Sequence, residues 1–188
     1  ALPISQSTQT PPLFGGHTSR AFQEGEGNFI RQTQEGGSNN FARAEQDGMN
    51  NRAIQEQQRN GNDAYIDQDG EDNTARQYQD MQTSLDAGSN NLARITQDGT
   101  GNVARQDQDL ARNDARIVQD GSNNYARQSQ NGVSAGIGHN QARTFQDGSG
   151  NSALTIQEGG ANFSNQPGHF ARIDQTGPGN SATIRQDN

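Results

Sequence analysis

Five aspartates recur at a spacing that could build a cation site. Each belongs to an Asp-Gly pair that follows a glutamine, and the series comprises Asp47, Asp69, Asp98, Asp120 and Asp147. If the segments that carry them stack as strands, the carboxylates lie about 4.8 Å apart along one edge and could form a low-affinity Ca²⁺ groove. A calcium-binding roll, however, draws several oxygen ligands per turn from a nonapeptide repeat, and this sequence has no such repeat. We favour a turn-forming role for Asp-Gly and predict no metal site.

The other residue types that carry chemistry form no catalytic pattern. His17, His139 and His169 share no ligand spacing, and no Ser/His/Asp or paired-carboxylate arrangement stands apart from the repetitive sequence. Glycine-rich links such as Gly159-Gly160 do not precede a helical pattern, as a phosphate site would require. The chain also has no cysteine, which excludes disulfides and thiolate metal sites. We therefore predict that the protein is not an enzyme and binds no cofactor.

A repeat positions these residues and fills most of the chain. Its fixed points read Gln-x-Gly-x-x-Asn-x-Ala-x-x-x-Gln, as in residues 119–130. The same frame starts at Gln46, Gln68, Gln97, Gln146 and Gln175 and, with Ile30 in place of the alanine, at Gln23. Seven-residue segments of two alternating kinds pair into seven repeats, at about 17–34, 40–57, 62–79, 91–108, 113–130, 140–157 and 169–186. A fixed period of this kind decides the architecture before any other signal is weighed.

The segments are predicted to be strands. Their apolar and amide residues recur at every second position, whereas a helix needs apolar residues at i, i+3 and i+4. Within a repeat the link is always four residues with glycine second, and between repeats it varies from 58–61 to 80–90, 131–139 and 158–168. Insertions on one edge alone are typical of a coil with one tight and one water-facing turn. The predicted fold is all-β, a β-solenoid of seven stacked strand-turn-strand coils that forms a cross-β amyloid subunit.

Positions 1, 3, 5 and 7 of each segment should face inward, carrying Asn, Ala, a variable residue and Gln. Buried amides are costly unless paired, and identical amides stacked in register can donate to one another. The predicted stacking ladder contains the glutamines Gln23, Gln34, Gln46, Gln57, Gln68, Gln79, Gln97, Gln108, Gln119, Gln130, Gln146, Gln157, Gln175 and Gln186 and the asparagines Asn28, Asn51, Asn73, Asn102, Asn124, Asn151 and Asn180. The predicted turn glycines are Gly25, Gly48, Gly70, Gly99, Gly121, Gly148 and Gly177.

Composition agrees with a repetitive fold that has a small apolar core. Only 27% of the chain is hydrophobic and its net charge is −8. This composition alone would suggest disorder. A disordered chain, however, has no reason to keep its amide residues at a fixed spacing, so the repeat argues against disorder. An outward arginine column, offset by nearby acids, serves solubility. An acidic chain with dispersed arginines is a poor nucleic-acid ligand, and no apolar run reaches transmembrane length. We predict neither nucleic-acid binding nor membrane insertion.

The prediction of function rests on the two ends of the stack of coils. Residues 1–16 do not match the repeat and predict a flexible N-terminal arm, and neither end shows a recognisable cap. Uncapped, matching strand edges are a template for another copy, and an end-to-end contact that does not close makes a filament. The alternative is a soluble, capped β-solenoid used as a binding or adhesive module. Ice binding would need an outward threonine array, and an adhesin would need caps and an anchor.

The repeat resembles that of the curlins, the subunits of curli fibres in bacterial biofilms. The curlin repeat is Ser-x5-Gln-x-Gly-x-x-Asn-x-Ala-x3-Gln, and it covers residues 17–186 here, with Asn or His in place of the opening Ser. The resemblance implies a secreted extracellular subunit that polymerises into amyloid for biofilm matrix, adhesion and surface colonisation. It also implies a nucleating minor subunit, an outer-membrane secretion channel and periplasmic chaperones as partners. By the same analogy, residues 1–16 resemble the family's secretion-targeting arm.

Overall fold

The protein is described here by a computed structural model, which covers residues 4–9, 16–79, 90–110, 112–131, 139–158 and 168–187. The prediction of an all-β chain is confirmed, because these residues form strands and no helix. The strands are β1 (Ile4–Gln9), β2 (Thr18–Gln23), β3 (Phe29–Glu35), β4 (Phe41–Met49), β5 (Arg52–Gln58), β6 (Asp63–Glu71), β7 (Thr74–Gln79), β8 (Leu92–Thr100), β9 (Val103–Asp109), β10 (Asn113–Ser122), β11 (Tyr125–Asn131), β12 (Asn140–Ser149), β13 (Ser152–Glu158), β14 (Phe170–Thr176) and β15 (Ser181–Asp187). Most of each of the three long links and most of the N-terminal arm lie outside the described residues.

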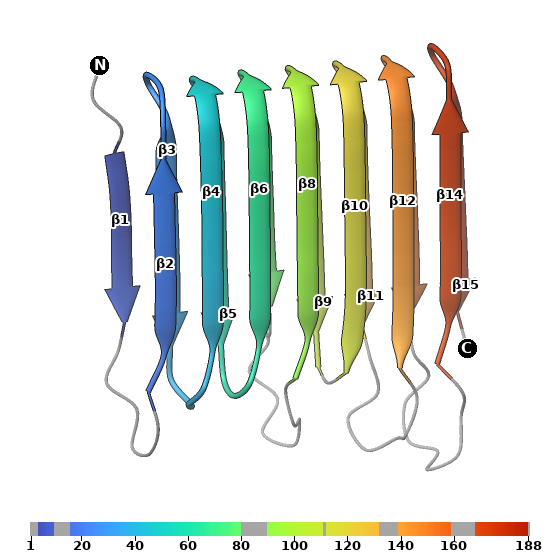
Figure 1. The fold of residues 1–188 in the computed structure, drawn as a ribbon. Helices are drawn as coiled ribbons and strands as arrows, with labels where there is room; N and C mark the ends of the chain where they lie inside the picture. The colour runs from blue at the N-terminus through green and yellow to red at the C-terminus, as the bar shows by residue number, and fades with distance from the viewer. Residues whose placement is uncertain are drawn as a thin grey trace.

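Successive strands alternate between two parallel sheets. The odd sheet has eight strands in the order β1-β3-β5-β7-β9-β11-β13-β15, and the even sheet has seven in the order β14-β12-β10-β8-β6-β4-β2. Figure 1 shows the sheets face to face, with strands of opposite direction in the two layers and the chain termini at opposite ends of the stack. Each repeat therefore contributes one strand to each sheet, and repeats add along one axis.

Pairing is in register with the sequence repeat. Between β6 and β8, for example, Ala64 pairs with Ala93 and Gln68 with Gln97. A slip by one residue would turn every inward side chain outward. The register continues across the pairs β4–β6 and β10–β12, whose connecting links differ in length. Equivalent residues of successive repeats therefore lie directly above one another.

The core between the sheets is narrow and combines small apolar and amide side chains. Burial alternates along most strands, as the strand period requires, and β8 is an example. One apolar cluster runs through the stack and consists of Ile30, Ala44, Ala53, Ile66, Ala75, Ile95, Ala104, Ile117 and Ala126. From Ile66 onward it alternates an isoleucine of the even sheet with an alanine of the odd sheet. Pairing large with small fills the gap closely.

Glycine closes the tight turn because the turns stack backbone on backbone. Gly99 has a φ of +108°, and a Cβ placed on it would lie 2.0 Å from the carbonyl oxygen of Gly121 in the next repeat. The strands β4, β6, β8, β10 and β12 continue through their Asp-Gly pairs and are longer than the seven-residue segments identified from sequence. Five of the seven turn glycines thus belong to the paired ladder, with Gly99 opposite Gly70 and Gly121.

Part of the N-terminal arm joins the odd sheet. Strand β1 pairs in parallel with β3 and places Ile4 opposite Phe29 and Gln9 opposite Gln34. The backbone N–H of Ile4 donates to the Asn28 carbonyl at 2.9 Å. Sequence reasoning recognised no cap at either end, whereas the structure covers half of the N-terminal end with β1. The even sheet ends at β2.

Candidate functional site

Glutamine side chains form three ladders inside the stack. In each ladder the Nε2 atom of one glutamine donates to Oε1 of the glutamine in the next repeat. The even-sheet ladder, with bonds of 2.7 to 2.9 Å, runs through Gln23, Gln46, Gln68, Gln97, Gln119, Gln146 and Gln175. The odd-sheet ladder at position 7, with bonds of 2.8 to 3.1 Å, runs through Gln34, Gln57, Gln79, Gln108, Gln130, Gln157 and Gln186. The third, at position 5 with bonds of 2.8 to 3.0 Å, joins Gln32, Gln55, Gln77, Gln106 and Gln128.

Backbone carbonyls of the opposite sheet fix the direction of these ladders. Gln97 Nε2, besides its bond to the next glutamine, donates to the carbonyl of Thr74 in the odd sheet at 3.2 Å. Gln77 Nε2 likewise donates to the carbonyl of Tyr65 in the even sheet at 2.9 Å. Because a carbonyl only accepts, neither amide can be reversed without losing this bond. All three ladders therefore point their N–H groups toward the C-terminal repeat, and they also hold the two sheets together.

The asparagine column is built differently from the amide-to-amide ladder suggested by the sequence. Oδ1 of Asn51 accepts the backbone N–H of Asn73 at 3.0 Å, and its Nδ2 donates to the carbonyls of Asp47 at 3.0 Å and Gly70 at 2.8 Å. The Oδ1 contact repeats through Asn28, Asn51, Asn73, Asn102, Asn124, Asn151 and Asn180. The shorter asparagine side chain stands beside the turn, where its nearest partners are backbone groups.

The outer faces carry arginine–aromatic contacts that sequence reasoning missed. The Arg94 guanidinium lies 5.2 Å from the centre of the Tyr65 ring. Arg116 and Arg172 lie 5.5 Å and 5.4 Å from the ring centre of Phe145. Such contacts are worth about 0.5–1 kcal/mol each at exposed sites. The sequence places aromatics and arginines together on the outward face at positions 2, 4 and 6, but which of them meet depends on side-chain rotamers.

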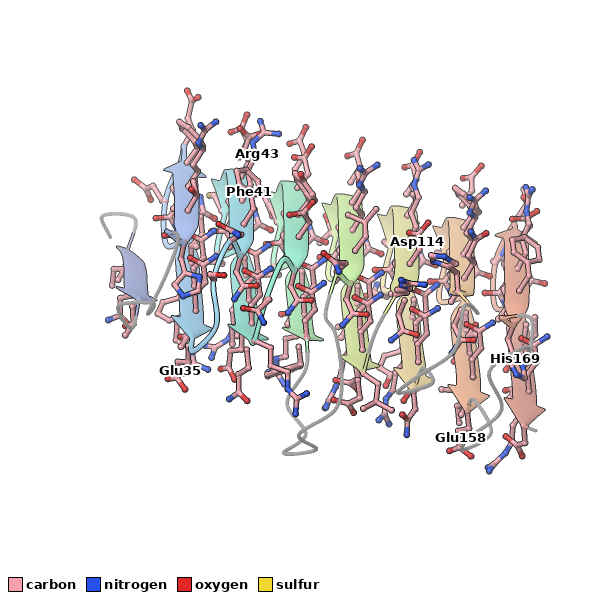
Figure 2. The ribbon with its side chains drawn as sticks, turned by 90° about the horizontal axis from the view of Figure 1, so that it is seen from below. Glu35, Phe41, Arg43, Asp114, Glu158 and His169 are labelled. Atoms are coloured by element: carbon pink, nitrogen blue, oxygen red, sulfur yellow. The ribbon has the colours of Figure 1, made fainter. Side chains whose placement is uncertain are left out.

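Ion pairs offset part of the stacked arginine charge. Asp107 on the odd sheet contacts Arg105 at 2.9 Å and Arg127 at 3.3 Å, and so bridges two repeats. Figure 2 shows charged side chains along both outer faces, with Arg43 on one side of the molecule and Glu158 on the other. Surface pairs contribute about 0–1 kcal/mol each, and the Asp107 pairs are partly buried.

The turn aspartates stack as expected, with Asp69 opposite Asp47 on the neighbouring strand. Beside them on the outer face, desolvation raises the pKa of Asp67. The carboxylates of Glu45 and Asp69 raise this pKa further, against the lowering effect of Arg43. Among the described residues, no group of three His, Cys, Asp or Glu side chains could hold a metal ion.

The three histidines stand just before strands of different repeats. His169 takes the place of an asparagine, and its backbone N–H donates to Asn140 Oδ1 at 3.0 Å. His17 directly precedes β2, and His139 directly precedes β12. His17 and His169 occupy the first position of a repeat segment, whereas His139 lies in a link.

The two ends of the stack expose groups that every inner repeat buries. In β15 the inward residues Ala182, Ile184 and Gln186 are half-buried, whereas Ala153 and Gln157 of β13 are fully buried. At the other end, Ala21 of β2 is exposed and Gln23 half-buried. Strands β14, β15 and β2 each pair on one side only within the described structure.

The even-sheet ladder and the position-7 ladder of the odd sheet each end at the C-terminal repeat with a glutamine that has no glutamine beyond it in the described structure, and the even-sheet ladder begins with an acceptor at Gln23. Gln175 Nε2 donates to the Ser152 carbonyl at 3.0 Å, and Gln186 Nε2 donates to the Phe170 carbonyl at 3.1 Å. Neither has a further glutamine to donate to among the described residues. At the N-terminal end, Gln23 donates into the stack at 2.9 Å, which leaves its Oε1 facing outward along the axis.

Comparison with known proteins adds no relative, because no protein-family model and no curated protein matches this chain. The part of the chain that the structure describes also contains no helix long and apolar enough to cross a membrane. Function is therefore inferred from the ladders, the strand edges and the sequence repeat.

Proposed function

We propose that this chain is a structural subunit of an extracellular fibre in which copies stack end to end by β-strand pairing. On this proposal the two sheets are the walls of a β-solenoid of seven strand-turn-strand coils, and the fibre is a cross-β amyloid. The observation that carries the proposal is the match between the two ends of the stack. The C-terminal end presents the edges of β14 and β15 with glutamine donors, and the N-terminal end presents the open edge of β2 with the acceptor of Gln23.

Stacking a second copy in the internal register matches the ends residue by residue. Strand β14 of one copy would pair with β2 of the next, so that Gln175 Nε2 donates to Gln23 Oε1. Strand β15 would take the place of β1 beside β3 and bring Gln186 opposite Gln34. These contacts repeat the 2.8 Å bonds that Gln175 and Gln186 already accept within the chain from Gln146 and Gln157. The interface thus continues the interior.

The direction of the ladders permits only head-to-tail stacking. Two C-terminal ends would place the Nε2 donor of Gln186 against another donor, and two N-terminal ends would place the Gln23 acceptors against each other. A head-to-tail contact uses two different surfaces and does not close on itself, so it produces a filament. Strands perpendicular to that axis at about 4.8 Å spacing are the cross-β arrangement.

The setting of the fibre follows from the curlin resemblance of the repeat. On that basis we place the subunit outside the cell, on the bacterial surface or in the biofilm matrix, where it serves adhesion and surface colonisation. Its partner is first of all itself. A nucleating subunit, an outer-membrane secretion channel and periplasmic chaperones complete the proposed set of partners.

Electron cryomicroscopy of the refolded protein tests this proposal. After denaturant is removed at neutral pH, we expect filaments with an axial repeat near 4.8 Å, that is about one strand spacing, and continuous glutamine ladders across subunit boundaries. A stable, monodisperse monomer under these conditions would contradict the proposal. The soluble binding or adhesive module would then be the better account of the fold.

A pair of glycine variants tests the stacking mode itself. A Cβ added to Gly177, where φ is +88°, would meet nothing within 4 Å, and the same is true of Gly150 at φ +65°. In the proposed fibre Gly177 faces Gly25 of the next copy, as Gly25 faces Gly48 inside the chain, where a Cβ would lie 2.0 Å from a carbonyl oxygen. We expect Gly177→Ala to fold but not to polymerise, and Gly150→Ala to do both. Polymerisation of both variants at the wild-type rate would exclude this interface.

A further inference from the structure

The N-terminal end of the stack is asymmetric because β1 covers only one of its two sheets. The inward residues of β3 are as buried as those of inner repeats, with Ile30 and Gln34 at 0% exposure. In β2 of the same repeat, Ala21 is exposed and Gln23 half-buried. The difference follows the pairing, since β3 has β1 beside it and β2 has no strand on that side in the described structure.

We propose that β1 is a displaceable internal cap that occupies the place of β15 from a second copy. This inference rests on the proposed end-to-end function and adds to it the step that controls each addition. Strand β1 lies against β3 in parallel and in register, as each odd strand lies against the next. An incoming β15 needs that same edge, so β1 and a second copy exclude each other.

The incoming copy cannot avoid this competition by shifting along the axis. Strands β14 and β15 are joined by the tight turn at Gly177, and their inner counterparts pair at the same level in the two sheets. If β14 pairs with β2, then β15 must pair with β3. Moving β15 out by one strand to the far side of β1 would stretch the turn by about 4.8 Å.

An incoming copy should bind at the edge of β3 more strongly than β1 does. Strand β1 has six residues and covers one sheet, whereas the incoming end pairs β14 with β2 and β15 with β3 at once. The open edge of β2 is the first contact, and β15 then replaces β1 by strand exchange. The cap therefore slows assembly and leaves the fibre unchanged once formed. A subunit competent only when uncapped binds more weakly in proportion to the uncapped fraction.

A disulfide that holds β1 in place tests the cap directly. Thr8 and Thr33 are register partners on the outward side of β1 and β3, and the chain has no cysteine of its own. Neighbouring strands about 4.8 Å apart fall within the Cα separation of about 4.4–6.8 Å that a disulfide spans. We expect oxidised Thr8→Cys/Thr33→Cys protein to remain monomeric and to polymerise when a reductant opens the bond.

The matched control is a disulfide between two inner strands of the same sheet. Ser129→Cys/Ile156→Cys joins register partners of β11 and β13, at the same outward position and away from both ends. Oxidised control protein should polymerise at the wild-type rate. Polymerisation of the oxidised Thr8–Thr33 variant at the wild-type rate, with the bond verified by mass spectrometry, would overturn the cap. Failure of the wild type itself to polymerise would instead overturn the proposed function.

Removal of residues 1–16 gives the opposite and independent test. The truncated chain should elongate wild-type fibre seeds about tenfold faster than the full chain, because every subunit is uncapped. Small amounts of the oxidised Thr8–Thr33 variant should stop wild-type growth at one fibre end only, since the added copy presents a locked β3 edge there. Equal elongation rates for the truncated and full chains would also overturn the proposal.

Discussion

At the scale of single residues, Gln77 shows why the repeat keeps chemical identity and not only polarity along the stack. It accepts from Gln55 at 3.0 Å, donates to Gln106 at 3.0 Å and donates across the core to the Tyr65 carbonyl at 2.9 Å. The side chain is 0% exposed, so no water replaces a lost partner. A residue of similar polarity but different length would reach none of the three.

Gln77→Ala is therefore expected to destabilise the folded chain by about 3 kcal/mol or more, from buried groups left unpaired and the cavity they line. Gln141→Ala is the matched control, because Gln141 lies on the outward face and is half-buried. Its expected effect is within about 0.5 kcal/mol. Urea unfolding of dilute protein measures both. Equal losses for the two variants would show that the ladder adds no stability beyond surface polarity.

At the scale of elements, each tight turn is a strand-to-strand link whose backbone must touch the turn of the next repeat. The strands on either side stack at a fixed spacing, so the turns have no freedom to separate. Glycine meets both conditions at this position, since it tolerates positive φ and leaves room for the neighbouring carbonyl. The asparagine beside the turn then donates to that same carbonyl, as Asn51 does to Gly70 at 2.8 Å.

Gly99→Ala should cost about 3–5 kcal/mol, because strain at its φ adds to a backbone clash that no side-chain movement can relieve. The control is Gly36→Ala, where φ is +64° and nothing lies within 4 Å of the added carbon. Only left-handed backbone strain of about 1–2 kcal/mol applies there. Thermal or urea unfolding would give both values. A Gly99→Ala loss no larger than the Gly36→Ala loss would rule out the stacked-turn explanation.

At the scale of the whole molecule, charge opposes stacking because neighbouring repeats place acids in the same outer columns, as Glu45 and Asp67 do. The chain carries a net charge of −8, and Asp67 lies among other carboxylates on the even sheet. Its pKa is raised above the ordinary value of 3.8 by desolvation first and then by Glu45. Between the ordinary pKa and the raised pKa, Asp67 is mostly protonated in the folded chain and mostly ionised in the unfolded chain. Acidification through that window therefore stabilises the fold.

We expect the urea midpoint of the wild type to rise as pH falls from neutrality into this window, and assembly to become faster. Asp67→Asn should raise the midpoint at pH 7 and weaken the pH dependence, because the neutral amide removes both the desolvation cost and the repulsion from Glu45. Thr96→Asn, one repeat further in the same column, is the non-titrating control and should keep the wild-type pH dependence. An unchanged dependence in Asp67→Asn would contradict the assignment.

The sequence alone predicted contacts well where the contacting residues are themselves part of the repeat. The in-phase glutamines at position 7 predicted two of the three glutamine ladders, because identical amides gain from register; the ladder at position 5 was not predicted. Three features of the structure could not be predicted from the sequence. The bonds of Asn51 depend on how close the turn carbonyls come, the contact of Arg94 with Tyr65 depends on neighbouring rotamers, and the pairing of β1 with β3 follows no repeat motif.

The amino-acid sequence by itself determined the alternation of inward and outward residues, the strand class and the register, since these are local periodicities with one consistent solution. Only the tertiary structure decided the direction of the ladders, because an amide can point either way until the carbonyls of the opposite sheet are in place. It also decided that β1 covers one sheet and leaves β2 open. That choice depends on an edge that exists only after the two sheets have formed.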